Sequence, residues 1–283
     1  MNHPARLRSV LLFAVVLLVS GCTVPTEAPP VEVMSFNVRY ANPNDGANVW
    51  AQRRELVFDV LRDCGPDLVG LQEALPAQMD ELGAAFPDYR FLGQGREGGR
   101  RGEFSALMVR DERFEVLESG DVWLSRTPDQ VGSRDWDAAL PRMCTWAVLR
   151  DRVSGAELLV MNTHFDHRGE EARRESAGVL LAERARHPEL PVILTGDLNA
   201  DEDSPPLQAL RAGGLRDSFR DVHPGADPVG TFNGFRGELG GAKIDYVLVD
   251  ERWATLAAGI VRVHEEGRYP SDHFPVTATL RLR

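Results

Sequence analysis

Four short apolar segments of this chain each stop at a polar residue, and this pattern leaves few folds open. Each segment has the length of a single strand and is apolar along almost all of it. Strands of this kind are buried on both faces, so the sheet that they form has to be covered by other layers. The segments span residues 31–37, 67–73, 158–164 and 192–199.

Amphipathic helices are predicted between these segments. The pattern places them at residues 51–61, 75–85, 170–186 and 205–212, with Pro76 near the start of the second and Ser204 as the N-cap of the last. Further strands are predicted within residues 104–149, which also contain many loop signals, and at 243–249 and 274–280. Two sheets packed face to face, with the helices outside, use all of these elements.

Composition supports one globular domain over residues 31–283. The chain has 283 residues, of which 43% are hydrophobic and 27% charged, so it can bury a sizeable core. After the N-terminus no apolar run approaches the roughly 20 residues of a membrane-spanning helix. Acidic residues number 43 against 32 basic ones, for a net charge of −11. This charge disfavours nonspecific electrostatic binding to nucleic acid or to an anionic membrane. We expect a monomer.

The N-terminal residues are typical of an export signal. Arg6 and Arg8 precede an apolar run at residues 10–19, and residues 18–22 resemble a bacterial lipobox that ends in Cys22. The interpretation is a lipoprotein signal peptide at 1–21, lipidation of Cys22 and a proline-rich tether at 22–30. The protein would then be anchored to the cell envelope, in the periplasm or on an outer-membrane face. An uncleaved anchor and plain secretion are the alternatives.

Cys64 and Cys144 remain once Cys22 is assigned to lipid. They lie far apart in the sequence and have no close cysteine neighbour, which argues against a zinc ribbon. An exported compartment permits a disulfide between them. Two separate buried thiols are nevertheless the expectation.

Polar residues at the ends of the predicted strands form the candidate site. A strand-ending Asp or Asn is often only a turn former or a helix cap. Here such residues recur in separate segments, and they combine carboxylates, amides and two histidines without a Ser or Cys nucleophile motif. This mixture suits a hard divalent cation that acts on a phosphate. The residues are Asn37, Glu73, His164, Asp197, Asn199, Asp245, Asp272 and His273.

Six motifs in a fixed order resemble those of the endonuclease/exonuclease/phosphatase superfamily, over roughly residues 31–283. They are SFN at 35–37, LQE at 71–73, NTH at 162–164, TGDLN at 195–199, KIDY at 243–246 and SDH at 271–273. The resemblance implies the DNase-I-like fold, a four-layer α-β-β-α sandwich of two packed mixed sheets in the α/β (α+β) class. It also implies Mg²⁺- or Mn²⁺-dependent hydrolysis of a phosphoester at one rim of the sheets.

Asn37, Glu73 and Asp272 are the candidate metal ligands, because Mg²⁺ takes a few oxygen ligands from protein and keeps part of its water. Arg39 stands two residues after Asn37, where some nuclease relatives carry another acidic ligand. This difference puts a second metal position in doubt.

The catalytic candidates combine imidazoles with carboxylates. His273 would be the base that activates water or a phosphate-binding imidazolium. The resemblance makes Asp245 its orienting partner. Asp197 would align or deprotonate the attacking water, and Asn199 would donate to a phosphate oxygen.

His164 would be a second imidazole on the other side of the phosphate. Glu103 occupies the place where nucleases of the superfamily carry a carboxylate that pairs with this histidine, so a Glu103–His164 pair is predicted. A solvated acid at a strand start is the alternative for Glu103.

Substrate contacts are predicted for Arg142, Arg101, Trp136 and His167. Arginine suits bidentate contact with phosphate. Trp136 would stack on a sugar or a base, or act as a packing residue of a lid. A solvated turn is the alternative for Arg101, and a surface or helix-cap histidine is the alternative for His167.

The sequence therefore predicts an exported Mg²⁺- or Mn²⁺-dependent phosphoesterase acting on a phosphodiester or phosphomonoester of a small or lipid-linked substrate. A DNase-I-like endonuclease or exonuclease is the first alternative, since nucleic acid remains open but is not favoured. A binding lipoprotein that keeps the fold without catalysis is the second.

Overall fold

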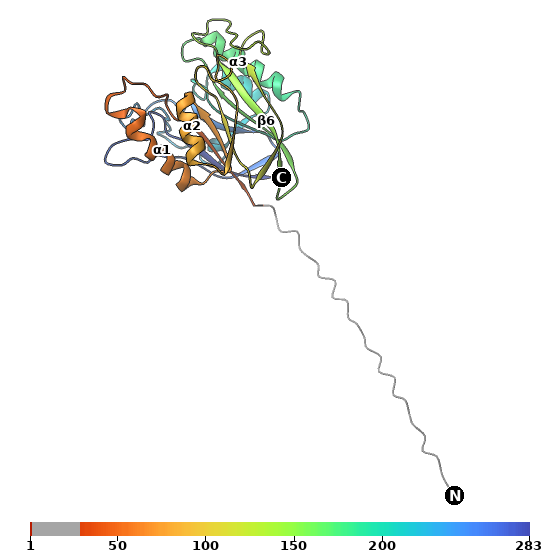
Figure 1. The fold of residues 1–283 in the computed structure, drawn as a ribbon. Coiled ribbons are helices and arrows are strands. Elements are labelled where there is room, and N and C mark those ends of the chain that lie inside the picture. The colour runs from red at the N-terminus through yellow and green to blue at the C-terminus, as the bar shows by residue number, and fades with distance from the viewer. Residues whose placement is uncertain (2–28) are drawn as a thin grey trace.

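The computed structural model of this protein describes Met1 and residues 29–283 (Figure 1). The predicted signal peptide, the lipidation site Cys22 and most of the tether lie outside the described residues. Among the residues that are described, no helix combines the length and the apolar character needed to cross a bilayer.

Two six-stranded sheets form the centre of the molecule. In each sheet two neighbouring central strands are parallel, β1 with β2 and β7 with β8, and the other pairings are antiparallel. The first sheet has the order β11 (Trp253–Ile260), β12 (Val276–Leu282), β1 (Val31–Asn37), β2 (Leu68–Gln72), β4 (Leu107–Arg110) and β3 (Tyr89–Leu92). The second has the order β5 (Phe114–Trp123), β6 (Met143–Asp151), β7 (Glu157–His164), β8 (Val192–Asp197), β10 (Asp245–Val249) and β9 (Arg216–Asp217).

Helices cover the outer face of each sheet, which gives the predicted four layers (Figure 1). Helices α1 (Trp50–Cys64) and α2 (Pro76–Ala85) pack on the first sheet, and α3 (Glu170–Arg184) and α4 (Pro205–Ala212) on the second. A separate apolar core lies between the sheets and includes Val33, Val160 and Ile193. The continuous apolar character of the central strands is explained by this burial on both faces. The short elements η1 (Gly46–Asn48) and α5 (Ser218–Val222) complete the fold.

Most predicted elements are present, with differences at their ends. The strand predicted at 274–280 runs from Val276 to Leu282, and the one predicted at 243–249 begins at Asp245. Ser204 is the N-cap of α4, but its hydroxyl donates to the Asp201 carbonyl instead of accepting a helix N–H. Cys64 and Cys144 are both free, as expected, although Cys64 is only half-buried.

A buried polar bridge joins the two sheets close to one rim. The Asn162 amide on β7 donates to the backbone carbonyls of Leu71 and Ala106, at 2.8 and 2.9 Å. Its carbonyl oxygen accepts from Gln72 Nε2 at 2.7 Å and from Thr195 Oγ1 at 3.0 Å. Because every atom of this amide has a partner, the bridge fixes the register of one sheet against the other.

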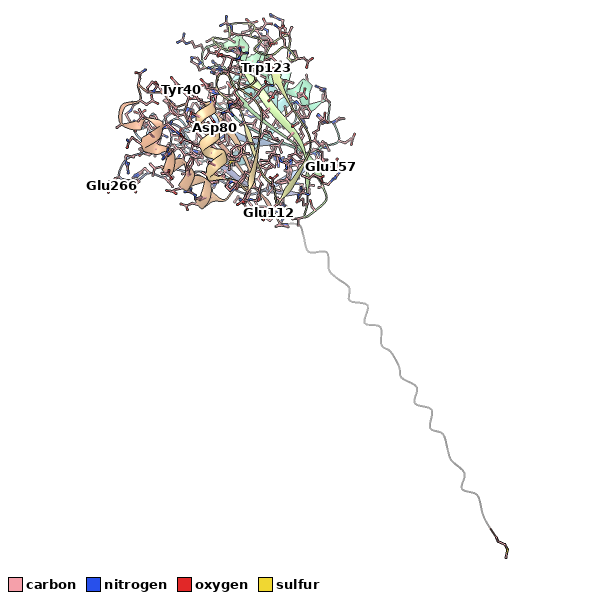
Figure 2. All side chains as sticks on the ribbon, viewed as in Figure 1. Tyr40, Asp80, Glu112, Trp123, Glu157 and Glu266 are labelled. Carbon is pink, nitrogen blue, oxygen red and sulfur yellow. The ribbon has the colours of Figure 1, made fainter. Side chains whose placement is uncertain are left out.

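The parallel strand pairs bring their carboxyl ends to this same rim. Asn37 lies beside Gln72 in one sheet, and His164 lies beside Asp197 in the other. Tyr40 follows β1 and Trp123 is the last residue of β5, so both mark this rim. Figure 2 shows them at the opposite end of the body from Glu112. The first described residues before β1, which include Pro29, lie at the Glu112 end, where the Pro29 carbonyl accepts from Arg113 at 2.7 Å.

Candidate active site

A cleft of about 830 Å³ opens at the rim where the parallel strands end. The residues that line it come from both sheets and from the loops that follow them. One side is acidic and carries two imidazoles, and the other is lined by arginines. The lining includes Arg39, Tyr40, Glu73, Arg96, Glu103, Arg142, His164, His167, Asp197, Asn199, Phe232, Ile244, Asp272 and His273.

Asn37, the last residue of β1, orients the carboxylates of Glu73 and Asp197. Its amide nitrogen donates to Glu73 Oε1 at 3.0 Å and to Asp197 Oδ2 at 2.9 Å. Its oxygen is turned away, where it accepts the backbone N–H of Arg39 at 2.9 Å. In this arrangement Asn37 positions Glu73 and Asp197 through its amide nitrogen. Its role as a metal ligand through Oδ1 stays a prediction.

Arg39 lies between the two carboxylates predicted to bind metal. Its guanidinium is 4.0 Å from Glu73 Oε2 and 3.7 Å from Asp272 Oδ2, and it makes a bidentate pair with Asp45, with both contacts at 3.0 Å. Burial raises the pKa of Asp272, and the Glu73 carboxylate adds to this effect. Negative charge is thus concentrated at this point, and Arg39 neutralises only part of it.

His164 is held in one tautomer by Asn199. The Asn199 amide nitrogen donates to the Phe165 carbonyl at 3.1 Å and lies 3.0 Å from His164 Nε2. Since that nitrogen is a donor, His164 Nε2 accepts and the ring proton sits on Nδ1. Burial and the positive charge of Arg142 lower the pKa of His164 well below its ordinary value, so the ring is neutral. Asn199 engages both amide hydrogens here, which makes it a positioning residue for His164.

His273 has the opposite electrostatic setting. Its Nδ1 lies 2.9 Å from Asp245 Oδ2, as predicted, and its Nε2 lies 3.8 Å from Asp197 Oδ2. Burial alone would lower the pKa of His273, but the Asp245 and Asp197 carboxylates outweigh it and raise the pKa well above its ordinary value. Burial and Asp245 raise the pKa of Asp197 to about 7. One imidazolium, one neutral imidazole and a carboxylate with a raised pKa thus face the same cleft.

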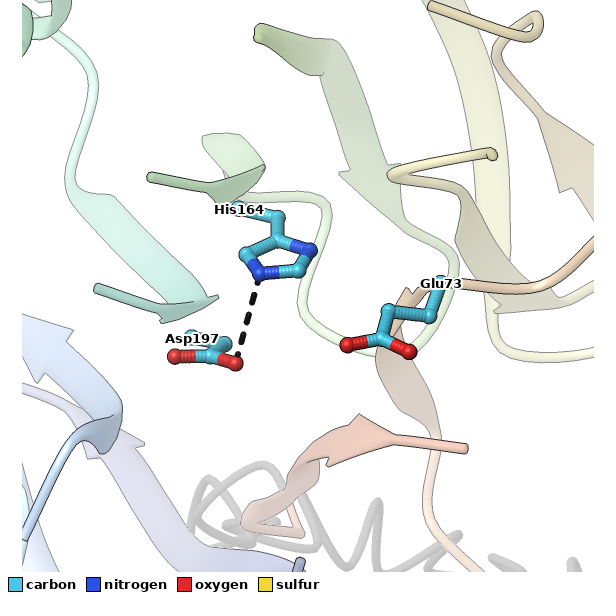
Figure 3. Close-up of side chains that lie close together, drawn as sticks. All are labelled: Glu73, His164 and Asp197. Carbon is cyan, nitrogen blue, oxygen red and sulfur yellow. Dashed lines mark ion pairs between the residues drawn. The ribbon is translucent and has the colours of Figure 1, made fainter. Parts of the chain in front are cut away.

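The donor set of the acidic side fits a hard divalent cation. Oxygen and nitrogen atoms of Glu73, His164 and Asp197 lie within 4.8 Å of one another, and Figure 3 shows these side chains converging from three strand ends. The Asp197–His164 pair in that view is 3.4 Å long. Carboxylates without a thiol are typical of Mg²⁺ or Mn²⁺ chemistry, and a cation would relieve the repulsion between these buried acids.

The backbone is strained at the residues that carry these groups. Glu73, Asn199 and Arg39 have φ angles of 67°, 46° and 55°, in the left-handed region that residues other than glycine rarely adopt. Asn tolerates this conformation better than most side chains, and Glu does not. Such strain often marks functional sites, where the surrounding contacts hold the side chain in place.

Two predicted substrate contacts lie in the cleft, and two do not. Arg142 and His167 line the cleft, with Arg142 Nη2 3.1 Å from His167 Nδ1. Arg101 instead donates to the backbone carbonyls of its own loop, at Glu97 and Gly98. Trp136 stacks under the Arg126 guanidinium at 5.4 Å. Neither Arg101 nor Trp136 is among the described residues that line the cleft, so the alternatives of a surface turn and a packing residue describe them better.

Glu103 pairs with Arg96 and not with His164, so the predicted Glu103–His164 pair is wrong. Glu103 does lie in the cleft, but its carboxylate accepts from Arg96 Nη1 at 2.7 Å. A guanidinium in the loop before Glu103 is closer and fully charged, whereas His164 is neutral, so Arg96 is the stronger partner for a carboxylate.

Sequence reasoning did not identify Arg96, Tyr40 or Phe232 as site residues. Phe232 is 45% exposed at the cleft and packs edge-on against His273, with ring centroids 5.2 Å apart. Arg96 lies in the same loop as Arg101, which was the residue of this loop predicted to contact substrate. The signal for Phe232 was an aromatic residue in a polar segment, and it was too weak to single this residue out.

Comparison with known proteins agrees with this geometry. The model of the Endonuclease/Exonuclease/phosphatase family matches residues 34–273. A crystal structure of a protein of this family from Bacteroides thetaiotaomicron is 34% identical, with 91% of this chain and all (100%) of that chain covered and a TM-score of 0.85. No curated protein matches the chain significantly.

Two further solved structures show how widely the fold is shared. The mannosyl-6-phosphatase Bt3783 of Bacteroides thetaiotaomicron is 36% identical, covers 88% of this chain and 99% of its own, and has a TM-score of 0.81. The catalytic domain of human Nocturnin has a TM-score of 0.74 over 90% of this chain and 96% of its own, but at 18% identity this likeness concerns the fold alone.

Proposed function

The chain belongs to the Endonuclease/Exonuclease/phosphatase family, and on that premise we propose that it is a metal-dependent hydrolase of a small phosphoester. The observation that carries the proposal is the convergence of Glu73, Asp197 and two imidazoles in opposite protonation states on one cleft. Behind His273, the Asp245 carboxylate orients the ring. A module that only binds a ligand has no need of this combination.

Glu73 and Asp272 would hold the cation, with His164 and Asp197 close to it. The bound Mg²⁺ or Mn²⁺ would supply neutralisation of the charge that develops on the phosphoryl group. Arg39 occupies part of the acidic side and favours a single cation over two.

The side chains of this protein supply the remaining chemistry. Asp197, with a pKa of about 7, accepts a proton from the attacking water near neutral pH. The raised pKa keeps His273 an imidazolium, so besides the Nδ1–H directed at Asp245 the ring carries a proton on Nε2 that faces the cleft. That proton stabilises a phosphate oxygen or is donated to the leaving group. Neutral His164 would contact the phosphate on the side opposite His273 during an in-line displacement.

A small substrate is favoured by the size of the cleft. Its volume of about 830 Å³ lies within the range of small-molecule sites. The name of the 36% identical relative describes a phosphatase that acts on a mannosyl 6-phosphate group, which supports a phosphorylated sugar as the substrate class. The net charge of −11 remains an argument against a long polyanion such as nucleic acid.

Anchoring at the cell envelope is proposed from the lipobox at Cys22. The cleft lies at the carboxyl end of β1, and residue 29 lies before the opposite end of that strand. This arrangement would direct the cleft away from a membrane to which the N-terminus is attached.

Hydrolysis of p-nitrophenyl phosphate and of bis(p-nitrophenyl) phosphate with Mg²⁺ or Mn²⁺ tests the proposed function. We expect turnover that EDTA abolishes, that added metal restores, and that Asp197→Asn and His273→Ala each remove. Asp203→Ala, in an exposed loop, is the matched control and should retain full activity. Absence of turnover on both esters and on DNA would leave the binding lipoprotein as the better interpretation.

A further inference from the structure

Two buried arginines on one side of the cleft have donors that the protein itself leaves unpaired. Arg96 and Arg142 are only 9% and 6% exposed. The Nε atoms of both are buried and have no hydrogen-bond partner. Burying a guanidinium donor without a partner is costly, so a pair of such donors at a cleft points to an anionic ligand.

The counter-charges on this side are already engaged. Arg142 has Asp166 as its nearest carboxylate, 3.6 Å from Nε, and Asp166 accepts from the backbone N–H groups of Leu140, Arg168 and Gly169. Glu103 pairs with one end of Arg96 only. Arg142 also places Nη2 3.1 Å from His167 Nδ1. Asp166, Glu103 and His167 together still leave the Nε donors of both arginines without a hydrogen-bond partner. Arg39, on the other side, differs in that Asp45 takes two of its donors.

A small pocket beside the cleft limits what the anion can be. It has a volume of about 10 Å³ and is lined by Arg96, Glu103, Arg142, His164 and three neighbouring residues. A space of this size accommodates about one oxygen atom or water, but not a carbon substituent. It lies against His164, and so beside the place where the reacting phosphate would sit.

We propose that Arg96 and Arg142 form a subsite for the non-reacting oxygens of a terminal phosphate, which makes the enzyme selective for phosphomonoesters over phosphodiesters. A monoester near neutral pH carries close to two negative charges and three terminal oxygens, whereas a diester carries one charge and two such oxygens. The additional oxygen fits the small pocket and meets two charge-assisted donors. The alkyl group of a diester would meet the same donors and leave them unpartnered. The inference rests on the proposed function and specifies the substrate class of the same site.

The ratio of kcat/KM for p-nitrophenyl phosphate to that for methyl p-nitrophenyl phosphate tests this inference, with the full chain and saturating Mg²⁺ or Mn²⁺. The wild-type protein should favour the monoester. Arg142→Gln should lower this ratio by about 10-fold or more, mostly through the monoester, since one charge-assisted contact to a dianion is lost. Arg96→Lys, which keeps the charge but loses the planar fork, should lower it less.

Arg100→Gln is the matched control, because Arg100 lies in the same loop as Arg96 but is exposed and paired with Asp80. Its ratio should equal that of the wild type. Calorimetric titration with inorganic phosphate in the presence of Mg²⁺ gives a second readout, and Arg142→Gln should weaken binding by about 10-fold. Circular dichroism checks folding, and Arg96→Lys keeps the test decisive if Arg142→Gln does not fold.

The outcomes separate this inference from the proposed function. Turnover of both esters with a ratio that neither arginine variant changes would overturn the inference alone. A wild-type preference for the diester would do the same. Absence of turnover on both esters would overturn the proposed function and the inference with it.

Discussion

Replacing Asp166 with Asn should destabilise the protein at neutral pH and have almost no effect in acid. The Asp166 carboxylate is 1% exposed and accepts backbone N–H groups from Arg168 and Gly169, at 3.0 and 2.8 Å, and from Leu140 at 3.2 Å. Burial alone would raise the pKa of Asp166, but these donors and Arg142 lower it to about 2. The shift from an ordinary value near 3.9 corresponds to about 2 kcal/mol of folding free energy.

The sign of the pH dependence follows from the lowered pKa. A carboxyl group with a lower pKa in the folded state stabilises the protein above its unfolded value, near pH 4, and loses this contribution as the pH falls toward 2. Urea unfolding at pH 7, 4 and 2.5 should show a deficit of about 2 kcal/mol for Asp166→Asn that shrinks toward zero with acidification.

Asp59→Asn, in an exposed pair with Arg62 on α1, is the control and should change stability by about 0.5 kcal/mol or less at any pH. A deficit for Asp166→Asn that stays constant from pH 7 to 2.5 would refute the electrostatic reasoning. It would mean that the aspartate acts only through its shape.

Three further outcomes are expected. Asp245→Asn removes the charge that orients His273 and should lower kcat by about 100-fold or more with little change in melting temperature; a fall below about 3-fold would mean that His273 works without this partner. Gly70→Ala places a methyl group 2.0 Å from Thr195 Oγ1 between the sheets and should lower the unfolding free energy by at least about 2 kcal/mol in urea titrations, whereas Gly83→Ala meets nothing within 4 Å and should not destabilise. Removal of divalent metal with EDTA should lower the thermal midpoint relative to protein saturated with Mg²⁺ or Mn²⁺, because the cation binds only the folded chain; equal midpoints would contradict a metal site in the cleft.

Local sequence signals were sufficient for the central part of the fold. The strands that end at Asn37, Asp197 and His164 are apolar and buried on both faces. A continuous run of apolar residues predicts burial of this kind directly. The strand β11 was not predicted, because its Ala, Thr and Gly residues carry no strong alternation and all of its residues except Trp253 are partly or fully exposed. The short helix α5, with five residues, is too short to show a helical period.

The residue pattern was enough to predict the central strands and the chemical groups at their ends, since parallel strands of one sheet present those ends at a common rim. The pairing of these groups became visible in the folded molecule: Glu103 pairs with Arg96 instead of His164, and Asn37 and Asn199 are donors that orient their neighbours. A side chain takes its partner by competition among the charges and donors within a few ångströms. Those distances depend on loop paths and on the register between the two sheets, and a residue pattern along one chain does not contain them.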